Sequence, residues 1–256
     1  MKKMLWLLII AANAYSSDTY LGLENLGNAV EISLPLIART QVPVRNYTAD
    51  ERNLIIELYD TGVIRFDMEQ LTPYANTVRS DRSPYYADFR HLISHPTIQK
   101  KIIKLLIKKV AELSFDIVCG VPYAALGLAA NFSYELSVPL IMRRSDRKTY
   151  GTCKKIEGTF RPGMRCLLID DVITTGSSML ETIQDLEQEN LSVTDCLVLF
   201  DRQQGGVRRY ENRGYTVHPL FTIEDFMNVL QECGKIDQAF AQKVLDWSKR
   251  HQTNLE

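Results

Sequence analysis

The stretch Cys166–Glu181 (CLLIDDVITTGSSMLE) brings together residues that could hold a phosphorylated sugar. Its apolar start predicts a buried strand, and Asp170 and Asp171 come at the end of that strand. Adjacent carboxylates can accept hydrogen bonds from two vicinal sugar hydroxyls or orient the waters of a metal ion. A turn of small and hydroxyl-bearing residues that enters a helix offers free backbone N–H groups to a phosphate. That turn consists of Thr174, Thr175, Gly176, Ser177 and Ser178, so the pattern predicts a site for ribose 5-phosphate.

Other chemistries fit the sequence less well. Asp170 and Asp171 could simply cap a helix, but the coincidence of acid pair, turn and apolar strand favours a ligand site. The turn is not followed by Gly-Lys-Ser/Thr and the chain has no GxGxxG string, which argues against a P-loop and a dinucleotide-binding site. His91 and His95 have a metal-like spacing, yet Pro96 disfavours helical geometry at His95 and no Glu follows His91.

The elements that must position these residues alternate along the chain. Short apolar runs at 115–120, 138–142, 166–170 and 193–201 predict strands, and helical patterns occupy 123–136 and 177–186. Strands separated by helices indicate an α/β fold with a mostly parallel sheet, whose sites lie at the carboxyl ends of the strands. Further helices are predicted at 48–62, 98–113, 223–233 and 237–249, and a further strand at 84–90.

The segment Arg143–Arg161 interrupts this alternation. Its seven basic and two acidic side chains give it a formal charge of +5. It is too polar and too long for a tight connection between two elements. We interpret it as a mobile loop that awaits an anion; the alternative is a solvated surface loop.

Composition limits the class of protein. With 256 residues, 45% of them hydrophobic and 24% charged, the chain can form one large domain, with or without an appendage. The net charge of −1 does not favour a protein that binds nucleic acid through its overall field. The five cysteines include no CxxC pair, which is typical of reduced thiols in the cytosol.

The N-terminus has the pattern of a secretory signal, because Lys2 and Lys3 precede the apolar run Met4–Ala12 and Ala14 ends an Ala-Asn-Ala string. The run is shorter than the roughly 20 residues of a membrane-spanning helix, so no stable span is expected. Three interpretations stay open: a cleaved signal, an N-terminal helix that is buried or binds a partner, or upstream sequence from a misplaced start. We expect residues 1–48 to form a poorly ordered extension and residues 49–256 the domain.

Four strings together resemble the type I phosphoribosyltransferases. LLIDDVITTG resembles their phosphoribosyl pyrophosphate signature, and the strings FDIVCGVPYAALGLA, RRSDRKTYGTCKKIEG and VLFDRQQGG stand in the order of an orotate phosphoribosyltransferase. The likeness runs from about Glu51 to about Lys249 and is strongest to the orotate phosphoribosyltransferase half of UMP synthases. It implies a central, mostly parallel sheet flanked by helices, with a small hood and a mobile loop.

The resemblance also implies a reaction. Orotate would accept the 5-phosphoribosyl group of phosphoribosyl pyrophosphate, giving orotidine 5′-monophosphate and pyrophosphate in pyrimidine (UMP) biosynthesis. Mg²⁺ would arrive with the pyrophosphate, with no direct protein ligand, although waters on Asp170 or Asp171 could contact it. The enzyme would be cytoplasmic, because phosphoribosyl pyrophosphate is a cytosolic metabolite. It would form a homodimer in which the 143–161 loop reaches the neighbouring site.

Carried over residue by residue, the resemblance assigns roles. Asp170 and Asp171 would bind the ribose hydroxyls, and residues 174–178 would bind the 5-phosphate. Arg144 matches the arginine before the mobile loop, Lys148 the catalytic loop lysine, and Tyr150 the aromatic or histidine position after it. Orotate would be recognised by Arg202, Arg79 and Thr174.

Two departures from the family pattern bear on activity. Ser145 stands where a second basic residue is expected, and the orotate loop Arg79–Pro84 is one residue shorter and lacks a glycine. The guanidinium of Arg79 replaces the charge of the expected lysine but not its point geometry. These departures keep two alternatives open: a catalytically weak regulator that binds phosphoribosyl pyrophosphate, and a phosphoribosyltransferase for another base.

Overall fold

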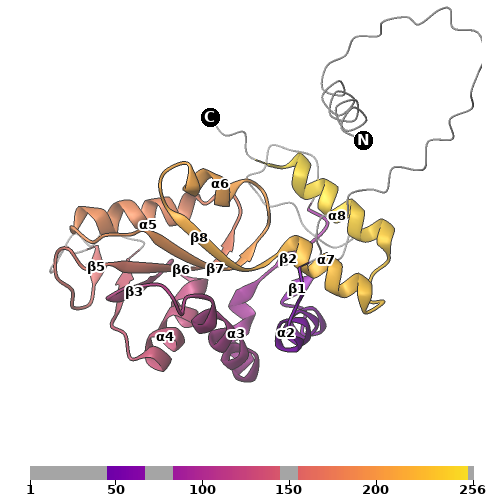
Figure 1. The fold of residues 1–256 in the computed structure, drawn as a ribbon, viewed down its shortest axis with the longest axis horizontal. Helices are drawn as coiled ribbons and strands as arrows, with labels where there is room; N and C mark the ends of the chain where they lie inside the picture. The colour runs from indigo at the N-terminus through magenta and orange to yellow at the C-terminus, as the bar shows by residue number, and fades with distance from the viewer. Residues whose placement is uncertain (1–44, 67–82, 145–154, 253–256) are drawn as a thin grey trace, which may run out of the picture. The chain divides into compact units, whose positions relative to one another are not determined.

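The computed structural model describes residues 45–66, 83–144 and 155–252, and a six-stranded sheet lies at the centre of this part (Figure 1). The order of the strands is β5-β4-β3-β6-β7-β8, and every neighbouring pair is parallel except β4 and β5. The strands are β3 (Ile117–Gly120), β4 (Leu140–Arg143), β5 (Ile156–Glu157), β6 (Cys166–Ile173), β7 (Asp195–Asp201) and β8 (Thr216–Thr222). The predicted α/β fold with a mostly parallel sheet is confirmed.

Helices cover both faces of this sheet. α3 (Pro96–Lys109) and α4 (Ala124–Leu136) lie on one face, and α5 (Ser177–Gln188) and α6 (Gly206–Glu211) lie on the other (Figure 1). Because successive strand residues point to opposite faces, each strand supplies two cores. On β6, Leu167 and Ile169 belong to the first core, whereas Cys166 and Leu168 belong to the second, with Met179 of α5.

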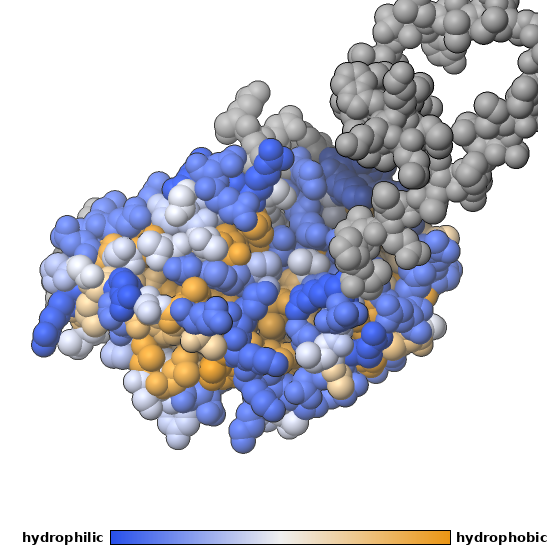
Figure 2. All heavy atoms as spheres, in the orientation of Figure 1, coloured by the Kyte–Doolittle hydropathy of each residue, from blue (hydrophilic) through white to orange (hydrophobic). Residues whose placement is uncertain are grey.

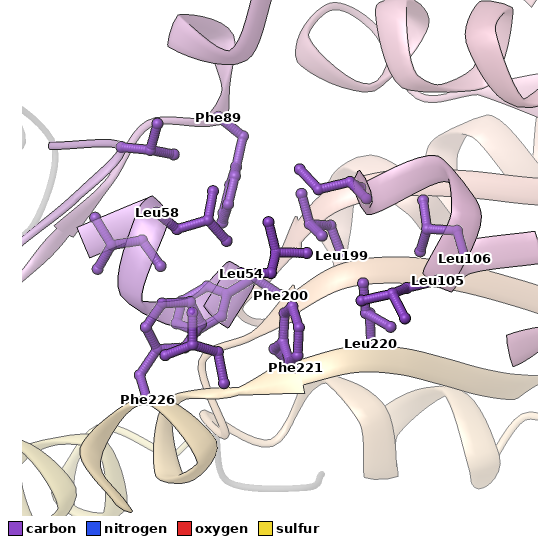
Figure 3. Close-up of a cluster of buried hydrophobic side chains, with 14 of the residues drawn as sticks. Leu54, Leu58, Phe89, Leu105, Leu106, Leu199, Phe200, Leu220, Phe221 and Phe226 are labelled. Carbon is purple, nitrogen blue, oxygen red and sulfur yellow. The ribbon is translucent and has the colours of Figure 1, made fainter. Parts of the chain in front are cut away.

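A smaller layer extends the first core beyond the sheet. It consists of α2 (Ala49–Asp60), α7 (Ile223–Glu232), α8 (Gln238–Arg250) and a two-stranded antiparallel sheet, β1 (Ile64–Arg65) with β2 (Tyr86–Ala87). Figure 3 shows Leu54 and Leu58 of α2 facing a group of phenylalanines at the sheet end. Phe200 packs edge-on against Phe226, with ring centroids 5.4 Å apart. This layer is the small hood expected beside the main sheet.

Three predicted boundaries were wrong by three or more residues. The strand predicted at 84–90 ends at Ala87, because the Asp88 carboxylate accepts the Arg90 N–H (3.2 Å) and starts a 3₁₀ helix, η2 (Phe89–Ser94). The helix predicted to reach residue 113 ends at Lys109. The strand predicted at 166–170 continues to Ile173, because β7 pairs with it as far as Asp201.

Polar side chains cover most of the face shown in Figure 2, and apolar ones gather around α4. Within the ranges given above, no helix has both the length and the apolar composition for a membrane span. The compact unit to which all these residues belong comprises Arg45–Glu256. Almost all of the extension predicted at 1–48 lies outside the described residues, so its boundary stays a prediction.

Candidate active site

The carboxyl ends of β3, β6 and β7 meet at a topological switch point. The chain leaves β3 towards β4 on one side and returns on the other side as β6. Ligands of open α/β sheets bind in the crevice that such a reversal creates. The ends of β6 and β7 are joined directly, because the backbone N–H of Arg202 donates to the carbonyl of Ile173 at 3.1 Å. The groups that follow these two strands therefore lie side by side.

The acid pair occupies two different environments. Asp170 lies on the face covered by α5 and α6 and is only 4% exposed, whereas Asp171 is half-buried on the opposite face. The sequence placed both carboxylates at the end of the strand; in the structure they lie within β6, three and two residues before its end. The Asp170 carboxylate also accepts the Asp171 backbone N–H at 2.9 Å. The two carboxyl groups are thus adjacent but not equivalent.

Burial changes the acidity of both groups. Burial, and then the neighbouring charge of Asp171, raise the pKa of Asp170 well above its usual value. The pKa of Asp171 is also raised, chiefly by burial. Because two adjacent carboxylates in a low-dielectric site cannot both ionise easily, Asp170 is the member that holds a proton more tightly. The pKa of Asp170 is therefore raised more than that of Asp171, and its protonated form is the more favoured of the two.

The hydroxyl-rich turn leads from β6 into α5 as the sequence predicts. Gly176 caps the helix with φ of 77°, a conformation that favours glycine. A Cβ at this position would lie 2.3 Å from Cε2 of the buried Tyr210 ring. Thr175 Oγ1 and Ser177 Oγ lie 3.4 Å apart at the start of the helix. The turn consequently presents hydroxyls and the first N–H groups of α5 at the sheet edge.

Arg202 follows β7 and is held from two directions. Its Nε donates to the Tyr85 hydroxyl (3.0 Å) and one terminal nitrogen to Ser83 Oγ (3.0 Å). Its guanidinium carbon lies 4.6 Å from the centre of the Tyr85 ring and 5.7 Å from that of Trp247 in α8. These contacts fix the plane of a cation able to pair with a carboxylate. Tyr85 and Trp247 were not predicted, and Trp247 carries no local signal because it lies in an ordinary amphipathic helix.

Arg144 lies at the start of the basic segment. One of its terminal nitrogens is 3.2 Å from Glu157, and its Nε is buried with no hydrogen-bond partner among the described residues. The neighbouring Arg143 and Lys155 both bind Asp185 of α5, Lys155 at 2.6 Å. The predicted site residues Lys148, Tyr150 and Arg79, and the departure at Ser145, lie outside the described residues.

Removing the Asp185 carboxylate should destabilise the protein. Asp185 is 6% exposed and neutralises two cations on β4 and beside β5, so Asp185→Ala leaves both without their shared partner. We expect the free energy of unfolding to fall by about 2–3 kcal/mol, because Lys155 keeps partial contact with water. Urea unfolding measures this loss. Glu181→Ala is the control, since Glu181 is 66% exposed and should cost under about 1 kcal/mol; equal losses would contradict the prediction.

Asp201 should make stability depend on pH. Burial raises its pKa to about 6, while its side chain accepts the Gln203 N–H at 2.8 Å. A carboxyl that binds its proton more tightly when folded stabilises the protein below its unfolded pKa and loses that effect as pH rises through 6. Between pH 4 and pH 7, the free energy of unfolding of the native chain should therefore fall by up to about 3 kcal/mol more than that of Asp201→Asn. Urea unfolding at each pH measures this difference. If the stability of the native chain and of Asp201→Asn changed with pH in the same way, the role of Asp201 would be refuted.

Comparison with known proteins shows the family to which this chain is similar. Residues 91–223 match the family model described as the phosphoribosyl transferase domain. Over 200 residues the chain is 34% identical to an orotate phosphoribosyltransferase of Caenorhabditis elegans, an alignment that covers 77% of this chain and 83% of the relative. The chain belongs to the orotate phosphoribosyltransferase family. The resemblance inferred from the sequence motifs is confirmed.

Longer members of this orotate phosphoribosyltransferase family are also similar. A bovine uridine 5′-monophosphate synthase is 38% identical over 194 residues, which make up 75% of this chain and 39% of that protein. The structure of Leishmania donovani UMP synthase aligns with a TM-score of 0.68 at 28% identity. The alignment covers 78% of this chain and 42% of the synthase chain. The chain therefore spans about two fifths of these two synthases.

The orotate phosphoribosyltransferase fold brings most of the predicted residues to one edge of the sheet. Asp170, Asp171, residues 174–178 and Arg202 meet there, and Arg144 begins the basic segment beside β4. Across the three described ranges, no three His, Cys, Asp or Glu side chains are grouped closely enough to hold a metal ion. The half-buried carboxylate of Asp171 fits a Mg²⁺ ion that is held through water and carried by a substrate. The roles assigned to these residues stay predictions.

Proposed function

We propose that this chain transfers the 5-phosphoribosyl group of phosphoribosyl pyrophosphate to orotate, releasing pyrophosphate and forming orotidine 5′-monophosphate for pyrimidine biosynthesis. Membership of the orotate phosphoribosyltransferase family supports the reaction class. The observation that carries the assignment is the bond between Arg202 N–H and the Ile173 carbonyl. It sets a cation suited to a carboxylated base directly beside the phosphate turn and Asp171.

The 5-phosphate is assigned to residues 174–178. The first N–H groups of α5 have no intrahelical partners, and the helix dipole favours negative charge at this end. The hydroxyls of Thr175 and Ser177 add donors at the same place. Anchored here, the substrate would present its ribose to the carboxyl end of β6, where the acid pair lies.

The acid pair is assigned to the ribose. The anomeric carbon gains positive charge as the bond to pyrophosphate breaks, in an oxocarbenium-like state typical of glycosyl transfer. The carboxylate of Asp171 would accept hydrogen bonds from the hydroxyls and stabilise that cation electrostatically. Asp170 accepts the backbone N–H of Asp171 and so helps to fix its position. No covalent intermediate with the protein is required.

Orotate is assigned to the pocket around Arg202. A guanidinium can pair with a carboxylate through two parallel hydrogen bonds, a geometry that lysine cannot supply. Tyr85 and Ser83 hold the guanidinium before the substrate arrives, which reduces the ordering that binding requires. Arg79 and Thr174 are further proposed contacts of the base.

Pyrophosphate is assigned to Arg144, Lys148 and Tyr150. The buried Nε of Arg144, which lacks a partner among the described residues, supports an anion at this position, because buried donors are normally satisfied. Mg²⁺, when bound with the substrate, would supply positive charge that stabilises the leaving pyrophosphate. We further propose that the active form is a homodimer in which the 143–161 loop reaches the neighbouring site.

An assay of the purified chain tests the function. Mg²⁺ and phosphoribosyl pyrophosphate are supplied with orotate, uracil or cytosine in turn, and loss of orotate absorbance is followed together with pyrophosphate release. Consumption of orotate alone is the expected result. Binding of phosphoribosyl pyrophosphate without turnover would indicate the regulator instead, and turnover of another base would reassign the substrate.

The cellular location follows from the substrate. Phosphoribosyl pyrophosphate is made and used in the cytosol, so we propose a cytoplasmic enzyme despite the signal-like residues 1–14. Mass spectrometry of the N-terminus of the endogenous protein tests this proposal. Cleavage after Ala14 and recovery from the secreted fraction would contradict it.

A further inference from the structure

Helix α6 touches the phosphate turn through two consecutive residues. One terminal nitrogen of Arg209 donates to the carbonyl of Thr175 at 2.9 Å and lies 3.4 Å from Ser177 Oγ. The hydroxyl of the buried Tyr210 donates to the next carbonyl, that of Gly176. Neither residue was singled out by the sequence motifs, because α6 has no phosphate-binding pattern of its own.

Close approach of α6 to the turn depends on a glycine. A Cβ at Gly206, the first residue of α6, would lie 2.4 Å from the carbonyl oxygen of Thr174 and 2.6 Å from Cγ1 of Ile173. Any side chain here would push α6 away from the end of β6. The helix therefore packs directly on the backbone of the turn, which explains why Arg209 and Tyr210 reach its carbonyl groups.

These two contacts decide which way the peptide groups of the turn face. In a planar trans peptide, the carbonyl of one residue and the N–H of the next point in opposite directions. With the Thr175 and Gly176 carbonyls turned towards α6, the N–H groups of Gly176 and Ser177 point away from α6. Within the described part of the chain, neither of these N–H groups has a hydrogen-bond partner. They are oriented for a ligand before it binds.

Arg209 also brings charge to the turn. Its side chain is half-buried, and among the described residues no carboxylate lies within 4.0 Å of its guanidinium. This cation lies on the carbonyl side of the turn, behind the two outward N–H groups, so its charge favours a bound phosphate electrostatically rather than by direct contact. Tyr210 contributes a neutral hydroxyl, and burial raises its pKa above the usual value, so it stays a donor at physiological pH.

We propose that Arg209 and Tyr210 are positioning residues that preorganise the 5-phosphate cradle, and that Arg209 adds the positive charge of that cradle. The inference rests on the proposed function only for the identity of the bound group, a sugar 5-phosphate. Its consequence is selective: affinity for the phosphorylated end of the substrate depends on α6, whereas affinity for pyrophosphate at the other end does not.

Binding of ribose 5-phosphate and of pyrophosphate to the full chain, each measured by calorimetry, tests this inference. Arg209→Met should weaken the binding of ribose 5-phosphate about 10- to 100-fold and change the affinity for pyrophosphate by less than about twofold. Tyr210→Phe should weaken the binding of ribose 5-phosphate by less, about 3- to 10-fold. The Gly176 carbonyl would still accept the Leu180 N–H at 3.2 Å, and this bond keeps part of its orientation. Arg209→Lys should restore part of the loss.

Arg208→Met is the matched control, because the neighbouring Arg208 is exposed on the same helix and carries the same charge. It should bind both ligands as the native chain does, and urea unfolding should show that all variants stay folded. Native affinity for ribose 5-phosphate in Arg209→Met, or an equal loss for both ligands, would overturn the inference. Failure of orotate turnover in the native chain would overturn the proposed function alone, since neither probe is orotate.

Discussion

Arg202→Gln is expected to lower kcat/KM for orotate by about 10²- to 10³-fold. The native guanidinium is fixed by Tyr85 and Ser83 and backed by Trp247, so the orotate carboxylate would meet a cation already in place. Glutamine retains a donor but has neither the charge nor the forked geometry. The affinity for phosphoribosyl pyrophosphate should stay near the native value, because the Arg202 side chain binds Tyr85 and Ser83, and its backbone N–H binds Ile173, which precedes the phosphate turn.

Steady-state kinetics with orotate varied at saturating phosphoribosyl pyrophosphate gives this ratio. Tyr85→Phe is an informative companion, because it removes only the hydroxyl that holds Nε and should cost about 3- to 10-fold. Arg208→Gln controls for the loss of one positive charge from the surface. If Arg202→Gln left kcat/KM within about threefold of native, the assignment of the base pocket would fail.

Asp171→Asn is expected to lower kcat by about 10²- to 10³-fold, since the amide cannot stabilise the positive charge that develops on the ribose. Asp170→Asn should lower kcat by less than about tenfold near pH 6. Burial and the neighbouring Asp171 raise the pKa of its carboxyl well above the usual value, which favours the neutral form, so we expect an amide of the same shape to replace it with little change in charge. The contrast between the two substitutions follows from their unequal burial.

The measurement is kcat for both variants from pH 5 to pH 8, with binding of phosphoribosyl pyrophosphate determined separately. Asp170→Asn should also be at least as stable as the native chain at pH 8, because burial of the Asp170 carboxylate disfavours its ionised form and so lowers stability as pH rises. Equal kcat losses for the two variants would mean that both carboxylates act directly on the ribose, as the sequence motif implies.

Under the proposed assignments, the two faces of the sheet would serve different parts of the substrate. The face covered by α5 and α6 carries Asp170, the phosphate turn and Arg209. The face joined to the hood carries Arg202 with Tyr85 and Trp247. A substrate lying across the sheet edge would place its phosphate against one core and its base against the other. Mutations in either core should therefore affect binding of one end more than of the other.

Several features could be read from the sequence because they depend on neighbouring residues. The alternation of apolar strands and amphipathic helices predicts the parallel sheet, since the period of burial differs between the two elements. The order acid pair, hydroxyl turn, helix predicts the phosphate end because those groups are adjacent in the chain. Arg202 could be placed at the same sheet edge because it directly follows a predicted strand, whereas its role towards orotate came from the family resemblance and stays a prediction.

Tertiary structure alone decided the features that depend on distant contacts. Tyr85 and Arg202 are 117 positions apart, and Arg209 and Thr175 are 34 apart, so no local pattern joins them. The extent of β6 depended on pairing with β7, and the 3₁₀ turn at Asp88 on a side-chain hydrogen bond that competes with strand pairing. The unequal acidity of Asp170 and Asp171 likewise arises from burial by packed elements. Two identical residues next to each other in the sequence give no sign of which one will be more buried.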